Sequence, residues 1–286
     1  MHPPYPDFDL ELRLLLEAIY VKYQHDFRQY AVTTMRRRVS QAMQRLGCAT
    51  VSRLQERVIH DPAVFSTLMS LLTVQVSEMF RDPPYFKAIR DQLIPVLETW
   101  PFLRVWVAGC AGGEELWSLA ILFAEEGLAD RTQFYATDIN PEALREAERG
   151  IYPIDRIAAF SSNYLAAGGR GSLSDYYAIA YGGASFARQV PCQAVFADHS
   201  LATDGAFAEV HFVSCRNVMI YFDRPLQDRA IDLFKASLVH GGFLGLGAKE
   251  TLRFSAHGAD FEEVDRAQRL YRHNKTANPL SHGAMA

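Results

Sequence analysis

The feature that most constrains this chain is the run Gly109-Cys110-Ala111-Gly112-Gly113, which lies between two apolar segments. The segment before it, Leu103 to Ala108, is short and apolar like a buried strand, and the segment after it, about Glu114 to Glu126, has the length and spacing of an apolar helix. Glycine allows a sharp turn between strand and helix, and it lets a ligand approach the backbone without a Cβ in the way. The sequence therefore predicts a parallel α/β sheet with a ligand site at this turn.

The charge at the start of that helix limits the choice of ligand. The glycines follow the pattern GxxGG and not the GxGxxG of dinucleotide sites, and the helix opens with Glu114 and Glu115. Negative side chains at a helix N-terminus repel a pyrophosphate. S-adenosylmethionine carries positive charge on its amino and sulfonium groups, so the electrostatics favour it over a dinucleotide.

After Pro101, short apolar strands alternate with helices, which is typical of a parallel α/β sheet. Glycines punctuate the stretch from Ile151 to Pro191, where we expect an insertion of short strands or loops that could serve recognition. The remaining predicted strands cover residues 133–137, 194–197, 210–214, 243–247 and 269–272, and the remaining predicted helices cover 141–149 and 225–238.

The first part of the chain has the periodicity of helices. From Leu10 to about Val76 the apolar residues recur at intervals of three and four, Gly47 suits a helix C-cap, and Asp61-Pro62 suits the start of a further helix. We therefore predict two domains: a small all-helical domain over residues 1–84, and a Rossmann-like α/β domain over residues 85–286 that begins with a linker helix at 85–98.

Composition and charge exclude several classes of protein. The formal net charge is -4, whereas a dedicated nucleic-acid binder is usually basic. No apolar run approaches the roughly 20 residues that cross a bilayer, and the first residues are polar and acidic, so we expect a cytoplasmic protein that inserts into no membrane. The cysteines have neither zinc-ligand spacing nor a disulfide pattern, so we expect no metal and reduced thiols at Cys48, Cys110, Cys192 and Cys215.

Polar residues follow two further predicted strands. Asp138 ends the second strand, where an acidic side chain can accept hydrogen bonds from both ribose hydroxyls of an adenosine; alternatively, it caps the helix that Pro141 begins. Arg216, Asn217 and Tyr221 follow the fourth strand. Ligands of open α/β sheets bind beyond the carboxyl ends of the strands, so these side chains are expected to line the pocket.

Four motifs in this order make the chain similar to the CheR-type chemotaxis-receptor methyltransferases, over about Asp9 to Tyr271. They are TVQVSEMFRDP, VWVAGCAGGEELWSLAILFAEE, YATDINPEAL and CRNVMIYFD. The resemblance implies a helical N-terminal domain on a Rossmann-like methyltransferase domain, with a small β insertion at about 163–190.

The resemblance also implies the cofactor, S-adenosylmethionine, with S-adenosylhomocysteine as product. Within it, Arg81 and Tyr221 flank the reacting centre. The cofactor-binding positions that it implies are Gln75, Ser77, Arg81, Gly109, Glu114, Asp138, Ser200, Leu201, Arg216 and Asn217.

The chain departs from the family pattern at several of these positions. The family usually has Asn at Gln75 and at Ser200, a Ser-Thr pair at Ala111-Gly112 and often Thr at Ser77. One lost hydrogen bond costs about 1 kcal/mol, so weaker cofactor binding is one outcome. A degenerate, non-catalytic cofactor-binding or scaffold protein is the alternative to an enzyme.

The resemblance implies methylation of glutamate side chains on a chemoreceptor or a related helical signalling protein, by a monomer that binds no nucleic acid. A glutamate carboxylate is already ionised at neutral pH, so the reaction needs alignment with the methyl group and not a general base. The basic side chains Arg36, Arg37, Arg38 and Arg45 would meet the acidic receptor helices, unless they are only a solvated helix face. Whether a receptor tail docks on the insertion stays open.

A second motif suggests a different enzyme. Asp82-Pro83-Pro84-Tyr85 matches the DPPY tetrad of amino-group methyltransferases that act on DNA. That tetrad should end a strand, but the residues before it resemble a helix, and the acidic balance also disfavours DNA.

Overall fold

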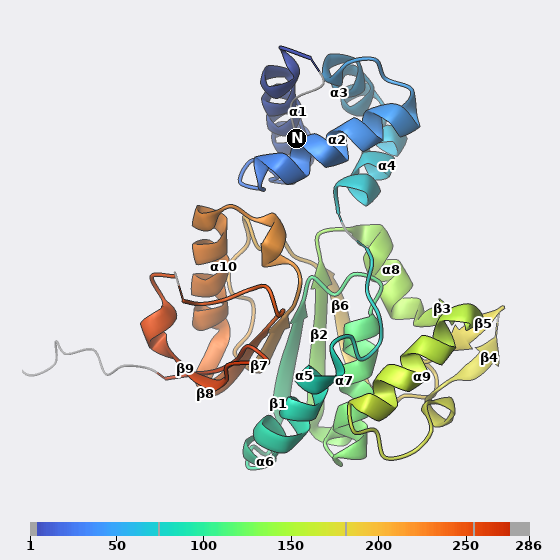
Figure 1. The fold of residues 1–286 in the computed structure, drawn as a ribbon, viewed down its shortest axis with the longest axis vertical. Helices are drawn as coiled ribbons and strands as arrows, with labels where there is room; N and C mark the ends of the chain where they lie inside the picture. The colour runs from blue at the N-terminus through green and yellow to red at the C-terminus, as the bar shows by residue number, and fades with distance from the viewer. Residues whose placement is uncertain (1–4, 74, 181, 254, 275–286) are drawn as a thin grey trace, which may run out of the picture.

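The computed structural model describes residues 5–73, 75–180, 182–253 and 255–274 and places them in two domains (Figure 1). A small bundle of helices lies at one end of the molecule, beyond one edge of a larger α/β domain (Figure 1). Residues 73 and 75–82 run between the two domains without helix or strand.

The helical domain contains α1 (Phe8–Tyr23), α2 (Val32–Leu46), α3 (Val51–His60) and α4 (Pro62–Leu72). The predicted helix signals are confirmed. Gly47 takes the left-handed conformation with φ of 66° after α2, and the Asp61 carboxylate accepts a 2.8 Å hydrogen bond from the backbone N–H of Ala63 at the start of α4. The regularly spaced apolar residues of α1 are buried in this domain's own core.

The predicted linker helix is continuous but not uniform. It comprises α5 (Pro83–Ala88), a π-helical turn η1 (Ile89–Leu93) and α6 (Ile94–Leu97). Pro95 has no N–H to donate to the preceding turn, and a wide turn just before it accommodates that loss. The DPPY residues thus begin a helix and do not end a strand, so the DNA-enzyme interpretation finds no support in the fold.

In the described part of the chain the central sheet has seven strands, in the order β6-β2-β1-β7-β8-β10-β9. The five from β6 to β8 are parallel, and β10 is antiparallel to both β8 and β9. The predicted α/β class is therefore confirmed. The strands are β1 (Leu103–Ala108), β2 (Thr132–Asp138), β6 (Gln193–Asp198), β7 (Val210–Cys215), β8 (Leu238–Leu246), β9 (Phe261–Asp265) and β10 (Leu270–His273).

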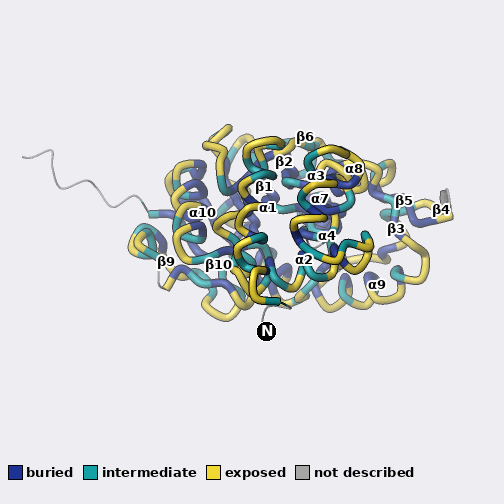
Figure 2. Tube along the Cα trace, turned by 90° about the horizontal axis from the view of Figure 1, so that it is seen from above, coloured by how far each residue is buried: buried dark blue, intermediate teal, exposed yellow. Residues whose placement is uncertain are grey.

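Side chains alternate across this sheet and build a core on each face. On β1, Val105 and Val107 pack in the core with α5, α7 (Glu114–Glu125) and α8 (Pro141–Arg149), while Trp106 packs on the other face with α10 (Arg224–Ser237). Figure 2 shows the buried trace inside an exposed outer layer. This two-sided burial explains why the sequence of β1 is almost continuously apolar.

The insertion differs in part from the prediction. It does contain a small antiparallel sheet in the order β3-β5-β4, formed by β3 (Ile151–Pro153), β4 (Ala178–Ala180) and β5 (Gly183–Ser185). The expectation of strands or loops alone was wrong, because α9 (Ile157–Ala166) lies between β3 and β4. Ile157, Phe160 and Tyr164 are its buried face, at spacings of three and four that the glycines nearby obscured. The sheet also begins at Ile151, before the implied start at 163.

A substitution at Gly245 tests how tightly the linker helix packs on the sheet. A Cβ on Gly245 of β8 would overlap the hydroxyl of Tyr85, which is hydrogen-bonded to Ser214 Oγ at 2.7 Å in the buried interior. Gly245→Ala is therefore expected to lower the free energy of unfolding by about 1–3 kcal/mol in urea titrations. Gly205→Ala is the control, because a Cβ there meets nothing within 4 Å. Equal stability of the two variants would contradict this packing.

Candidate functional site

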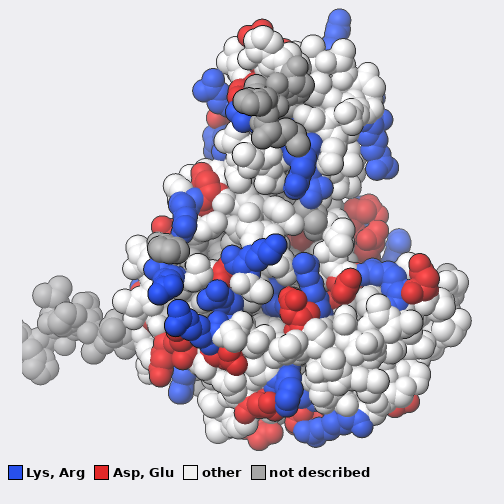
Figure 3. Space-filling model, viewed as in Figure 1, with Lys and Arg blue, Asp and Glu red and all other residues white. Residues whose placement is uncertain are grey.

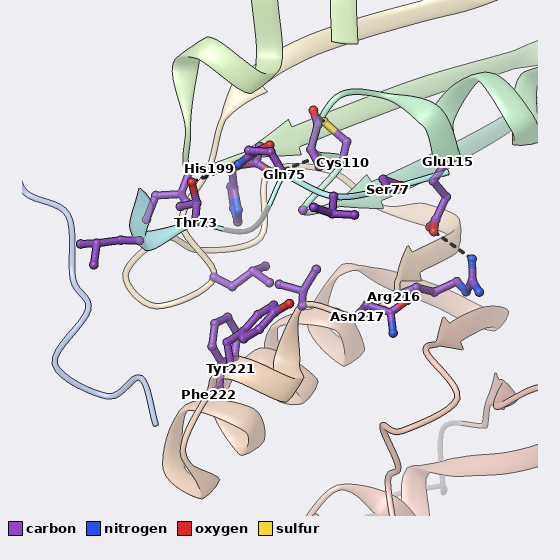
Figure 4. A pocket seen from close by; sticks show the side chains of 18 of the residues that line it. Thr73, Gln75, Ser77, Cys110, Glu115, His199, Arg216, Asn217, Tyr221 and Phe222 are labelled. Carbon is purple, nitrogen blue, oxygen red and sulfur yellow. Dashed lines mark hydrogen bonds and ion pairs between the residues drawn. The ribbon is translucent and has the colours of Figure 1, made fainter. Parts of the chain in front are cut away.

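A pocket of about 920 Å³, its open mouth included, lies at the carboxyl ends of β1, β2, β6 and β7 and is closed on one side by the helical domain (Figure 4). Most of the predicted site residues line it. These are Gln75, Ser77, Arg81, Gly109, Asp138, Leu201, Arg216, Asn217 and Tyr221. Glu114 and Ser200 are buried but are not part of the lining. The lining residues that sequence reasoning missed include Tyr30, Thr73, Cys110, Glu115, His199 and Phe222.

The glycine turn is shaped by close contacts on both sides. A Cβ on Gly109, which has φ of 70°, would lie 2.5 Å from Val218 Cγ2 in the loop after β7. The backbone N–H groups of Gly109 and Cys110 donate to the Thr137 carbonyl at 2.8 and 2.9 Å. The turn is therefore fastened to β2 and packed against the loop that follows β7, where only glycine fits.

Asp138 ends β2 inside the pocket and is 7% exposed. Its carboxylate accepts hydrogen bonds of 2.9 Å from the backbone N–H groups of Ala111 and Asn140. The cap of α8 is Asn140, whose Oδ1 accepts from the N–H of Glu142 at 3.0 Å, so the alternative reading of Asp138 as the cap of that helix is wrong. Burial raises the pKa of Asp138 above its ordinary value.

The two glutamates that open α7 have different surroundings. Glu114 is buried and pairs with Arg156 of the insertion at 2.8 Å, while Arg156 also donates to the backbone carbonyl of Ser77. Glu115 lines the pocket and accepts from Ser214 Oγ at 2.7 Å. Burial raises the pKa of Glu114, and the Arg156 guanidinium opposes that shift.

Arg216 is the most enclosed cation of the site, with a side chain only 2% exposed. Its guanidinium bonds Glu115 at 3.1 Å and Asp82 at 2.6 Å, and it donates to the Arg81 carbonyl at 2.9 Å. The ring of Tyr85 lies beneath it, 4.1 Å from the guanidinium carbon. A planar cation with several donors can hold all of these groups at once, which fastens the interdomain segment to the sheet.

The loop after β7 is fixed by a buried carboxylate, Glu250, that the sequence analysis did not single out. Glu250 is 5% exposed and accepts from the N–H groups of Asn217 at 3.0 Å and Ile220 at 3.2 Å, and from that of Gly247 at 2.7 Å. Asn217 adopts φ of 61°, a conformation that few residues other than glycine take. Glu250 thus satisfies backbone donors that would otherwise be buried without partners.

The helical domain contributes directly to the pocket wall through Tyr30. The Ala31 N–H donates to the Tyr221 carbonyl at 2.9 Å, and the Asp223 N–H donates to the Gln29 carbonyl at 2.9 Å. The ring of Tyr30 meets that of Phe222 edge to face at 5.0 Å. The loop between α1 and α2 therefore pairs with the loop after β7.

The basic residues of α2 do not all have the same surroundings. Arg36 is paired with Asp9 of α1 at 2.5 Å. Arg37 and Arg45 are exposed, and Arg38 is half-buried. None of these arginines lines the pocket described above.

Several polar atoms of residues that line the pocket or, for Glu114, lie next to its lining are buried and have no partner among the described residues. They are Gln75 Oε1, Glu114 Oε2, His199 Nδ1 and Arg216 Nε. Buried polar atoms normally have hydrogen-bond partners, so this mixture of acceptors and a donor fits a ligand with amino, hydroxyl and carboxylate groups. S-adenosylmethionine is such a ligand.

No group of three or more His, Cys, Asp or Glu side chains in the described part of the chain could hold a metal ion. No helix within it has both the length and the apolar character that a membrane span requires.

A substitution at Glu250 tests whether its carboxylate holds the loop after β7. Glu250→Gln replaces one accepting oxygen by an NH₂ group and leaves at least one buried N–H unpaired, so we expect a loss of about 1–3 kcal/mol in unfolding free energy. Hydrogen exchange at Asn217, Ile220 and Gly247 should become faster than in a Glu148→Gln control, which alters an exposed side chain. Unchanged exchange at these amides would show that the loop is held by other contacts.

Comparisons with known proteins show which family the chain resembles. Residues 75–269 match the family described as "CheR methyltransferase, SAM binding domain", and residues 10–73 match "CheR methyltransferase, all-alpha domain". The chain is 52% identical over 264 residues to "Putative methyltransferase Cher3" of Pseudomonas putida, covering 92% of this chain and 97% of that protein. It is 27% identical over 251 residues to "Chemotaxis protein methyltransferase" of Listeria monocytogenes, covering 86% and 92%.

Among solved structures, the N-methyltransferase NodS of Bradyrhizobium japonicum with S-adenosylhomocysteine is 15% identical, with a TM-score of 0.33 over 59% of this chain and 62% of that one. The family match spans most of the chain and covers both domains. We conclude that the chain belongs to the CheR methyltransferase family, whose cofactor is S-adenosylmethionine.

Proposed function

We propose that this protein transfers a methyl group from S-adenosylmethionine to glutamate side chains of a chemoreceptor-like signalling protein in the cytoplasm, giving glutamate methyl esters and S-adenosylhomocysteine. The observation that carries the proposal is the convergence of Asp138, Arg81 and Tyr221 on one pocket, at the junction of the two family domains. Relatives at about a quarter identity that are named chemotaxis protein methyltransferases support the choice of substrate.

Several side chains suit the cofactor. Asp138 would accept from the ribose hydroxyls, because it sits at the end of β2 and keeps acceptor capacity beyond its two backbone bonds. Glu114 would receive the amino group through its unpartnered oxygen. When bound, S-adenosylmethionine supplies an electrophilic methyl group on a sulfonium.

The remaining task of the protein is alignment. The substrate carboxylate is ionised at neutral pH and attacks without a base. Arg81 lines the pocket, and it would steer the anionic glutamate or grip the cofactor's carboxylate. Tyr221 would orient the sulfonium through its ring face. Holding the three reacting atoms in line in a site that excludes water lowers the barrier.

Charge on the helical domain supports an acidic partner. Figure 3 shows basic side chains on several sides of the helical domain, some of them on the edge that faces the α/β domain. On α2 the exposed Arg37 and Arg45 suit this role better than Arg36, whose charge is neutralised by Asp9. A local basic surface can attract acidic helices although the whole chain is negative.

The proposal is tested first by calorimetry with S-adenosylmethionine and S-adenosylhomocysteine. We expect micromolar binding that Asp138→Ala abolishes, and then transfer of a radiolabelled methyl group to purified receptor signalling domains. If neither compound binds at high protein concentration, the protein is a scaffold that keeps the fold without the chemistry.

The basic face of α2 has its own test. Reversing charge in Arg37→Glu and Arg45→Glu is expected to lower kcat/KM for the receptor about tenfold at low salt, with cofactor affinity unchanged. Arg53→Glu, on the exposed side of α3, is the control. If all three variants behave alike, α2 does not contact the substrate.

A pH titration tests the role of Asp138. Burial raises the pKa of Asp138 in the folded protein above the ordinary value of 3.8. The protonated carboxyl therefore favours the folded state, and this contribution to stability is complete below pH 3.8 and is lost as the pH rises through the folded-state pKa. Protonation of Asp138 therefore does not destabilise the fold through this group, but it turns one accepting oxygen into an O–H donor and so weakens the hydrogen bonds that the ionised carboxylate would accept from the ribose hydroxyls. Affinity for S-adenosylhomocysteine should fall on acidification before 3.8 is reached, while Asp138→Asn binds weakly at every pH. A flat wild-type profile would contradict the assignment.

A further inference from the structure

His199 follows β6 and is held in a fixed orientation inside the pocket. It is 8% exposed. Its ring packs edge to face on Trp106 at 5.2 Å and on Phe207 at 5.3 Å. Its Nε2 lies 3.1 Å from the backbone carbonyl of Gly205. The imidazole thus has aromatic contacts and one polar anchor, and it cannot turn freely.

The anchor determines which ring nitrogen carries hydrogen. A carbonyl oxygen only accepts hydrogen bonds, so Nε2 must be the donor, and in the neutral ring Nδ1 then carries a lone pair. Nδ1 is buried and has no partner among the described residues. His199 therefore offers the pocket an unused acceptor. Figure 4 shows His199 beside Gln75, across the pocket from Tyr221.

The position of His199 relative to Asp138 indicates which part of a ligand it meets. β6 is the neighbour of β2 in the sheet, with Asp198 in register with Asp138. The His199 N–H donates to the Asp138 carbonyl at 3.3 Å. If Asp138 holds the ribose, the group attached to the ribose on the β6 side meets His199 and the apolar side chain of Leu201.

The family resemblance implied a cofactor contact at Ser200. In the structure, however, the hydroxyl and the backbone N–H of Ser200 form hydrogen bonds within the turn that contains this residue. Its Oγ accepts from the Ala202 N–H at 3.3 Å, and its N–H donates to Asp204 Oδ2 at 2.9 Å. It is not among the pocket-lining residues. A side-chain hydrogen bond to the base would therefore come from another residue.

We propose that His199 recognises the adenine base of the cofactor, with Nδ1 accepting a hydrogen bond from the exocyclic amino group; this inference rests on the proposed function. The selectivity follows from the chemistry of the base. Adenine presents an amino donor at this position, whereas hypoxanthine presents a keto oxygen. The keto oxygen and Nδ1 are both acceptors, so no hydrogen bond can form between them. A buried acceptor without a donor is costly, so the site rejects the keto base.

The test compares two ligands on three proteins by calorimetry. The ligands are S-adenosylhomocysteine and S-inosylhomocysteine, which differ only at the base. Wild type should prefer the adenine compound by about tenfold, and His199→Leu should bring that preference close to one. His199→Asn should restore much of it, because Oδ1 of asparagine lies near the place of Nδ1 and also accepts. His60→Leu, an exposed histidine on α3, controls for an unspecific effect of losing an imidazole.

The outcomes separate this inference from the function on which it rests. If wild type binds neither ligand, the proposed function fails, and the role of His199 fails with it. If wild type binds S-adenosylhomocysteine and His199→Leu keeps the full preference for adenine, only the role of His199 is overturned. Loss of the preference in Gln75→Leu but not in His199→Leu would assign the base contact to Gln75, whose Oε1 also lacks a partner.

Discussion

The buried guanidinium of Arg216 is the interaction on which the site depends most. It joins the loop after β7 to Glu115 at the start of α7 and to Asp82 at the start of the linker helix. These three segments are far apart in sequence, and each carries a wall of the pocket. Two carboxylates, a backbone carbonyl and the face of an aromatic ring compensate for the loss of water around the cation. Removing either partner alone would leave a buried charge incompletely paired.

A second feature that recurs in the site is a buried carboxylate that accepts hydrogen bonds from backbone N–H groups. Asp138 holds the glycine turn through Ala111, and Glu250 holds the loop after β7 through Asn217 and Ile220. Both turns contain residues with positive φ, whose amides cannot join regular structure. A carboxylate accepts several such amides at once, so the protein keeps irregular loops rigid where a ligand must approach the backbone. Burial raises the pKa of both acids, and their amide bonds oppose that shift.

The sequence predicted the elements whose signals are local. The five parallel strands, the glycine turn and the caps at Gly47 and Asp61 all follow from patterns within a few residues, and the structure confirms them. The helix α9 was missed because glycines close by suggested loops, although its buried face has helical spacing. The strand β9 was missed because its sequence, FEEVD, is largely exposed and polar.

Other site residues were missed because their role depends on contacts distant in the chain. Tyr30 reaches the pocket only because the loop after α1 pairs with Phe222, and Glu250 reaches Asn217 from beyond β8. Nothing near either residue in the sequence indicates these partners. The difference between Glu114 and Glu115 likewise comes from tertiary neighbours, Arg156 for one and Arg216 for the other.

The short backbone pairing of Tyr30 with Phe222 has a thermodynamic consequence. One wall of the pocket belongs to a domain that has its own hydrophobic core. Any ligand that touches both walls binds best when the domains are docked. Thermodynamic linkage then requires that the ligand raise the docking equilibrium constant by the same factor by which docking raises the ligand's affinity. A cofactor that touched both walls would therefore be coupled to the docking of the helical domain, and a partner that favoured docking would raise cofactor affinity without touching the cofactor.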